Sequence, residues 1–294
     1  MVLETALADA LYLNWAIPLA ALPPAPTGLR YDLGPASGAS GGSRGAADND
    51  TDESVAYFSL VLFRQVGLHL RGASWLALSY PQIDARLYVR DAVNSASVLL
   101  LRQLAPGWVV PLGRLVGQPL SAAVCEFPDG LPAAPADSAP HATDGDALAD
   151  SRVWRWKFSA GARLCTAVRI GVPGGLGGFA GRADGGLGGG VEVPRPLAAR
   201  DWEAEVAFFR DRARAYWRQG GTLRRVETDR PATPALPVSA RIELTDWLET
   251  FLPFAPVAGW SEVHSAFLVP RVQFVFAFEG ARELPVAAPM TAAG

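Results

Sequence analysis

The residues best suited to binding or catalysis lie in the segment 83–90, where polar and apolar side chains alternate. One face of this segment carries Asp84, Arg86, Tyr88 and Arg90, whereas the residues between them are apolar. Period two is typical of a β-strand with two unlike faces. A polar face of this kind commonly points to solvent and has no chemical role. In a closed barrel it would instead point inward and line a cavity suited to an anionic or carbonyl ligand.

The three histidines, His69, His141 and His264, are far apart in the sequence. No HExxH motif, paired CxxC motif or close Asp/His cluster exists, so we expect no metal site. The lack of a G-x-S-x-G motif argues against a serine hydrolase. His264 is a candidate proton carrier, although a structural histidine held by hydrogen bonds is the commoner case.

A glycine-rich stretch at 175–180 matches the loose dinucleotide pattern G-x-G-x-x-A. That pattern binds a pyrophosphate only when a helix follows directly, because the helix N-terminus holds the anion. Here residues 181–190 contain six more glycines and no helical pattern. We therefore interpret the stretch as a flexible loop and expect no nucleotide or other cofactor.

Lysine is almost absent from the chain, which has Lys157 alone beside 25 arginines. The net charge is −3 and no run of arginine exists, so nucleic-acid binding lacks its electrostatic footprint. The two cysteines, Cys125 and Cys165, suit a reducing cytoplasm better than a disulfide scaffold.

The first 22 residues are apolar, but they carry Glu4 and Asp9, and no basic residue precedes Arg30. A signal peptide needs a positive start, so we expect none. No stretch reaches about 18 uninterrupted apolar residues, so we expect no membrane contact.

Strand patterns dominate the rest of the chain. Alternation or short apolar runs predict strands at 57–63, 66–71, 83–90, 153–158, 163–172 and 271–278, with a hairpin turn at 159–161. Many strands and few helices favour an antiparallel barrel or sandwich.

One helix is predicted with Asp201 as its N-cap. Trp202, Val206, Phe209, Ala213 and Trp217 recur at helical spacing, and Gly220-Gly221 is expected to end the helix. Weaker helical patterns cover residues 4–13 and 245–251.

Three segments rich in Gly, Pro, Ala and small polar residues lack the periodicity to bury a face. They are predicted loop insertions at about 34–53, 129–151 and 174–191. Since they interrupt strand-type segments, residues 1–294 are expected to form a single domain.

Several short segments, taken together and in order, carry a family resemblance. They are Asn14-Trp15 with Pro18 and Leu22-Pro23-Pro24, Tyr57-Phe58-Ser59-Leu60-Val61 with Phe63 and Gly67, Ala85-Arg86-Leu87-Tyr88-Val89-Arg90, Gly117-Gln118-Pro119, Tyr216 with Gly220-Gly221, and His264. The set resembles the YqjF-like family of bacterial proteins, in the acetoacetate-decarboxylase-like superfamily. The resemblance implies a mainly β fold, a cone-shaped antiparallel β-barrel around an apolar pocket.

Acetoacetate decarboxylases form a Schiff base through a lysine in the motif G-x-P-K-K, whose pKa is lowered by a second lysine and by the pocket. Here Leu120 and Ser121 occupy both lysine positions. A family glutamate falls at Gln82, and residues 1–14 lack the basic residue that binds substrate in the enzymes. The resemblance thus implies the fold without Schiff-base chemistry.

We therefore expect a cytoplasmic barrel protein that binds a small carboxylate or carbonyl ligand. The predicted contacts are Arg86, Tyr88, Arg90, Gln82, Gln118 and Ser121. One alternative is a lyase or isomerase acting on an oxo acid, in which Tyr88 or His264 moves protons and Arg86 holds the carboxylate. Another is a structural module whose barrel is filled by its own side chains. The sequence leaves oligomeric state open.

Overall fold

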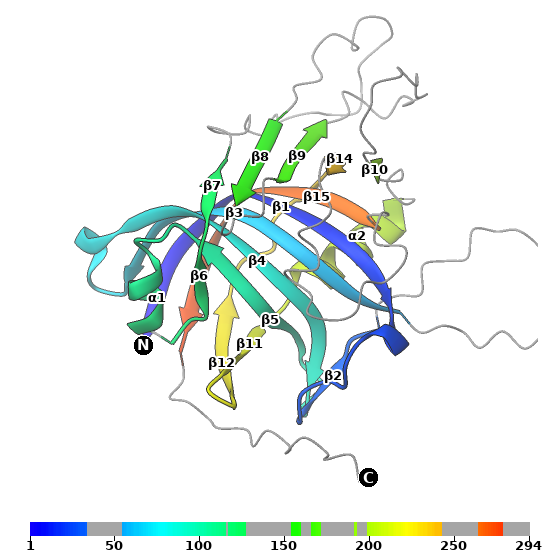
Figure 1. Cartoon of the computed structure of the whole chain (residues 1–294), viewed down its shortest axis with the longest axis horizontal. Coiled ribbons are helices and arrows are strands. Elements are labelled where there is room, and N and C mark those ends of the chain that lie inside the picture. The colour runs from blue at the N-terminus through cyan, green and yellow to red at the C-terminus, as the bar shows by residue number, and fades with distance from the viewer. Residues whose placement is uncertain are drawn as a thin grey trace, which may run out of the picture.

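The computed structural model describes residues 1–33, 55–115, 117–127, 154–159, 166–171, 191–192, 199–242 and 264–278. Strands dominate this part of the chain and a large sheet curls around itself (Figure 1). The expected mainly β barrel is therefore confirmed. The predicted insertions and the 245–251 helix lie wholly or almost wholly outside the described residues.

A ring of hydrogen-bonded strands closes the barrel. In order around the ring they are β4 (Leu78–Asp91), β3 (Val55–Leu70), β1 (Val2–Pro18), β15 (Ser265–Ala277), β12 (Thr222–Asp229), β11 (Arg214–Gln219) and β5 (Ala96–Ala105). Because β5 also pairs with β4, the ring has no open edge. The β5–β11 pair is parallel, and the other pairs of the ring are antiparallel.

Shorter elements complete the fold. They are β2 (Leu29–Tyr31), β6 (Leu120–Ala122) and β13 (Leu236–Pro237) on the barrel sheet, and η1 (Leu19–Ala21), η2 (Ser74–Leu76), α1 (Val110–Leu115) and α2 (Ala199–Arg210). A second sheet has the order β10 (Val191–Glu192), β14 (Ser239–Ile242), β9 (Thr166–Gly171), β8 (Trp154–Ser159) and β7 (Val124–Glu126). No helix in the described part of the chain is long and apolar enough to cross a membrane.

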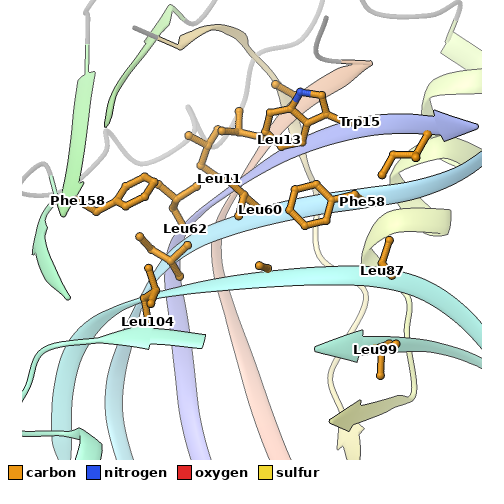
Figure 2. Packing of buried hydrophobic residues seen from close by; sticks show 14 of the residues in the cluster. Leu11, Leu13, Trp15, Phe58, Leu60, Leu62, Leu87, Leu99, Leu104 and Phe158 are labelled. Atoms are coloured by element: carbon orange, nitrogen blue, oxygen red, sulfur yellow. The ribbon is translucent and has the colours of Figure 1, made fainter. Parts of the chain in front are cut away.

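Two apolar clusters lie on opposite faces of the barrel wall. The outer cluster joins Leu11, Phe58, Leu62 and Leu87 with Phe158 of β8, so the second sheet packs against the outside (Figure 2). The inner cluster includes Tyr12 and Tyr88 from the wall and Val206 and Phe209 from α2. Helix α2 therefore packs into the barrel interior and fills part of it.

The weak helical prediction for residues 4–13 was wrong, because these residues lie in β1. This strand pairs with β15 on one side and β3 on the other, and it is buried on both faces. A strand buried on both faces reads as a continuous apolar run, which periodicity alone does not distinguish from a helix. Asp9, with a φ of 54°, marks a bulge in this strand.

The predicted helix from Asp201 was right in its first half only. Helix α2 begins at Ala199, so Asp201 is not its N-cap, and it ends at Arg210. Trp217 lies on β11, and Gly220 and Gly221, with φ of 55° and 83°, form the two-residue turn between β11 and β12. Glycines with left-handed backbone occur both at helix ends and in tight hairpin turns. Here the antiparallel pairing of β11 with β12 makes them a hairpin turn.

The separate strands predicted at 57–63 and 66–71 are one strand, β3, which ends at Leu70 and whose register with β4 shifts between Gln65 and Leu68. The predictions at 83–90 and 271–278 fall on β4 and β15. The predicted hairpin of 153–158 and 163–172 matches the antiparallel pair β8–β9, whose turn is outside the described residues.

Candidate functional site: a charged cavity inside the barrel

The barrel encloses a cavity of about 80 Å³ between its wall and the end of α2. Apolar side chains of the inner cluster form part of its lining, among them Leu7, Tyr12, Val61, Val98 and Phe274. Its uncharged polar lining consists of Gln65, Gln82, Gln103, Gln118 and Thr228. The barrel is thus hollow at this point, with a volume equal to that of about two or three water molecules in the liquid.

Five arginines and one acid line this cavity. The arginines are Arg86, Arg210, Arg212, Arg214 and Arg230, and Asp84 is the one carboxylate among the described lining residues. Since Asp84 and Arg86 lie on the same face of β4, the polar face of this strand points inward. Of the two interpretations open from the sequence, the structure supports the inward one.

Four of these arginines have carboxylate partners. Arg210 lies 2.8 Å from Asp211, and Arg230 lies 3.5 Å from the same residue. Arg212 lies 2.5 Å from Asp32. Arg214 likewise lies 2.5 Å from Asp91. The positive charges of these four arginines are therefore largely neutralised by carboxylates of the chain itself.

Arg86 differs, because no ion pair of the described residues includes it. Its Nε and Nη2 atoms donate to the Tyr88 hydroxyl at 3.2 and 3.0 Å, and Nη2 also donates to the Phe209 carbonyl at 2.9 Å. That carbonyl belongs to the last turn of α2, where the helix dipole is negative. The guanidinium carbon lies 5.0 Å from the Tyr12 ring centre and 5.3 Å from that of Tyr88.

These contacts explain how the barrel tolerates the charge. Burial acts to lower the pKa of the Arg86 guanidinium, but Tyr88, Tyr12 and Asp84 raise it above its ordinary value. Arg86 therefore stays charged. Its Nη1 group makes no hydrogen bond to the described residues, so two N–H donors remain for a ligand in the cavity.

A chain of hydrogen bonds runs from Arg86 away from the cavity. The Tyr88 hydroxyl lies 2.7 Å from Ser59 Oγ, which donates to Asn14 Oδ1 at 2.5 Å. Asn14 Nδ2 in turn donates to Ser265 Oγ at 3.0 Å. Because Ser59 gives its proton to Asn14, Tyr88 must donate to Ser59. Tyr88 therefore presents only its lone pairs to Arg86 and holds the guanidinium in place.

Glu205 of α2 lies beside Ser265 at the far end of this chain, and Ser265 acts to lower the pKa of its carboxyl. Glu205 Oε1 lies 3.6 Å from His264 Nε2, and the His264 ring packs 5.2 Å from that of Tyr57. Burial raises the pKa of Glu205 and lowers the pKa of His264. Both shifts favour the neutral forms, so the contact between Glu205 and His264 is not an ion pair.

The predicted site residues separate into three groups. Gln82, Arg86 and Gln118 line the cavity, and Tyr88 supports Arg86 from behind. Arg90, Ser121 and His264 are not among the lining residues. Arg90 instead donates to Asp32 at 2.7 Å. Alternation predicts an inward Arg90, but at this end of the strand Asp32 provides a nearer partner.

The segment Gly117-Gln118-Pro119, which carries part of the family resemblance, lies beside the cavity. Trp217 Nε1 donates to the Gly117 carbonyl at 2.7 Å and anchors the loop to the barrel. Leu120 packs against Gly113 and Tyr80 in a small satellite cluster, so Gln118 is the residue of this frame that reaches the cavity. Lys157, the single lysine, lies on β8 in the second sheet, outside the barrel ring.

Sequence reasoning missed several lining residues. Arg210, Arg212 and Arg214 alternate, which is a strand-type signal, but the helical interpretation of 201–217 concealed it. Gln103 lies opposite Asp84 in the β4–β5 register, a relation that only strand pairing establishes. Among the described residues, no group of three or more His, Cys, Asp or Glu side chains is placed to hold a metal ion.

No protein-family model matches the chain, and no curated protein sequence matches it either. Solved structures do share its fold. The enduracididine biosynthesis enzyme MppR complexed with pyruvate is 12% identical, with a TM-score of 0.51 over 98% of this chain and 92% of that one. An acetoacetate decarboxylase-like enzyme from Sphingomonas wittichii RW1 is 16% identical, with a TM-score of 0.50 over 96% and 92%.

The chain therefore has the acetoacetate-decarboxylase-like fold. At these identities the similarity shows the fold alone, since one fold serves many functions.

Proposed function

We propose that the chain binds a small carboxylate or carbonyl compound in the barrel cavity, with Arg86 as the main anchor. The observation that carries this proposal is the Arg86 guanidinium, which faces the cavity with free N–H donors and no carboxylate within ion-pair distance among the described residues. The free N–H groups both belong to Nη1, so a carboxylate would accept a charge-assisted hydrogen bond from this one nitrogen, and such a bond is stronger inside a protein than at a surface.

The resemblance to the YqjF-like family belongs to the same proposal. The matching segments supply β1, β3 and β4 of the barrel wall, including Asn14, Ser59 and Arg86 of the hydrogen-bond chain. The complex of MppR with pyruvate supports the ligand class, because that protein holds a small oxo acid in the same fold. A cytoplasmic location is also part of this proposal, and the free thiol of Cys125 is consistent with it.

The other two hypotheses receive less support from the geometry. A lyase or isomerase that uses Tyr88 or His264 needs one of them at the ligand, yet neither lines the cavity. A barrel filled by its own side chains is at odds with an open volume of about 80 Å³. Decarboxylation through a Schiff base lacks an amine at the family position, because Leu120 and Ser121 stand there.

Calorimetric titration with pyruvate and acetoacetate tests the proposal. We expect binding by the natural chain and a loss of at least tenfold in affinity for Arg86→Gln. Arg114→Gln, the same substitution at an exposed arginine of α1, is the matched control and should bind normally. Equal affinity for Arg86→Gln and the natural chain would overturn the proposal.

Treatment with acetoacetate and borohydride tests the exclusion of Schiff-base chemistry. We expect no covalent adduct in the mass spectrum of the intact chain. A stoichiometric adduct at Lys157, accompanied by loss of a measurable decarboxylation, would show that this lysine replaces the family's nucleophile.

A further inference from the structure

The cavity has a second polar region beside Arg86, formed by Asp84 and two glutamines. Gln82 Nε2 donates to Asp84 Oδ1 at 2.7 Å, and Gln103 Nε2 donates to the same oxygen at 3.1 Å. Gln82 precedes Asp84 by two residues on β4, and Gln103 faces it from β5. Both amides are thereby oriented by one carboxylate.

Both amide oxygens of this group are buried and have no hydrogen-bond donor among the described residues. The glutamines are 2% and 4% exposed, and both line the cavity. A buried carbonyl oxygen without a donor is unfavourable, because it has lost its hydrogen bonds to water and gained none in return. Two such oxygens beside a carboxylate form a site with an excess of acceptors, which is unusual within a protein interior.

The surrounding charge makes this region distinct. The other five charged lining groups are arginines, so the acceptor group is an acidic spot in a basic cavity. Burial raises the pKa of the Asp84 carboxyl, while its hydrogen bonds to Gln82 and Gln103 and the charge of Arg86 act to lower it. A cation bound beside Asp84 would therefore favour the ionised carboxylate.

We propose that Asp84, Gln82 and Gln103 form a subsite for a primary ammonium group, so that the bound compound is a small amino acid with its carboxylate on Arg86. An ammonium has three N–H donors and no acceptor, which matches two amide oxygens and a carboxylate. A hydroxyl has one donor and would leave two acceptors unmet. This proposal rests on the function proposed above and specifies its ligand class.

The spacing of the two regions limits the length of the ligand. Asp84 and Arg86 are two residues apart on one strand, so their Cα atoms are separated by about 6.6 Å. The acidic spot and the guanidinium are thus near enough for one compound with a few methylene groups between its charges.

Two matched series of compounds test the proposal on the full chain. The first consists of acetate, propionate, butyrate and pentanoate. The second consists of glycine, β-alanine, 4-aminobutyrate and 5-aminopentanoate, which add only a terminal ammonium. Calorimetry should show that, at one chain length, the amino acid binds at least tenfold more tightly than its partner.

Asp84→Asn should abolish this preference and still bind the simple carboxylates, because Arg86 is unchanged. Asp229→Asn, at an exposed position of β12, is the matched control and should retain the preference. Gln103→Met, which removes one acceptor at similar volume, should reduce the preference and provides a second test if Asp84→Asn does not fold.

The outcomes separate the two proposals. Equal binding of the two series overturns the ammonium subsite alone, and so does a preference that persists in both Asp84→Asn and Gln103→Met. If no compound of either series binds, the carboxylate site itself is overturned, and the subsite with it.

Discussion

The two faces of β4 present opposite solutions to burial. On the outer face, Ile83, Ala85, Leu87 and Val89 are fully buried in an apolar cluster. On the inner face, Gln82, Asp84 and Arg86 border a cavity. The outer face stabilises the barrel by packing, whereas the inner face keeps buried polar groups that contribute little to stability. A protein that needed only a stable barrel would have no reason to keep the second face polar.

The largest expected effect is at the outer face. Phe58 is fully buried and its ring lies 5.6 Å from that of Trp15 (Figure 2). Phe58→Ala should lower the free energy of unfolding by about 3–5 kcal/mol, because it leaves a cavity that the rigid wall cannot close. Urea unfolding measures this. A loss below about 1 kcal/mol would show that the outer cluster is not the main source of stability.

Tyr88→Phe should have a smaller effect, of about 1–3 kcal/mol, because the ring stays and only the hydroxyl is lost. Arg86 and Ser59 then lose a shared partner. We also expect weaker pyruvate binding, since the guanidinium is no longer held in position. Tyr216→Phe is the control: it removes a buried hydroxyl bonded to Asp91 and should leave pyruvate binding unchanged.

The buried Asp84 carboxyl on the inner face of β4 should make the stability of the chain depend on pH. Its pKa is raised above 3.8 in the folded chain, so the contribution of this group is fully present below pH 3.8 and is lost as pH rises through the folded pKa. Asp84→Asn removes that loss. The stability of the variant relative to the natural chain should thus increase as pH rises from 3.8 towards neutrality. Urea unfolding at several pH values would contradict this if the difference stayed constant.

The smallest expected effect concerns the predicted insertion at 174–191. Shortening residues 174–190 to a brief turn should change the free energy of unfolding by less than about 1 kcal/mol, because loop entropy varies slowly with length. Thermal unfolding of the shortened chain measures this. A marked fall in melting temperature would show that the segment packs against a folded face.

Much of the fold was predictable because β4, β8, β9 and β15 have one face unlike the other, or bounded runs of apolar residues. The inward polar face at Asp84 and Arg86 was visible as a pattern, but its direction was not. Both faces of β4 are covered, the outer one by the second sheet and the inner one by α2. Alternation separates the two faces but does not predict which of them points into the barrel.

The two incorrect helix predictions, at residues 4–13 and in the second half of 201–217, both result from long-range strand pairing. Residues 4–13 resemble a helix because β1 is buried on both sides, and Trp217 falls in helical phase with α2 although it lies on β11. Strand pairing between distant residues decided both cases. Such pairing also brought Gln103 to Asp84, which no local pattern indicates.

The sequence by itself determined a strand-rich chain whose single lysine, Lys157, lies outside the segment Gly117-Gln118-Pro119. Residue types and period-two spacing suffice for these conclusions because they are local properties. Only the tertiary structure decided that Arg86 is left without a carboxylate partner among the described residues while its arginine neighbours are paired. The reason is physical: whether a buried charge is free depends on which distant side chains the closed barrel brings within a few ångströms of it.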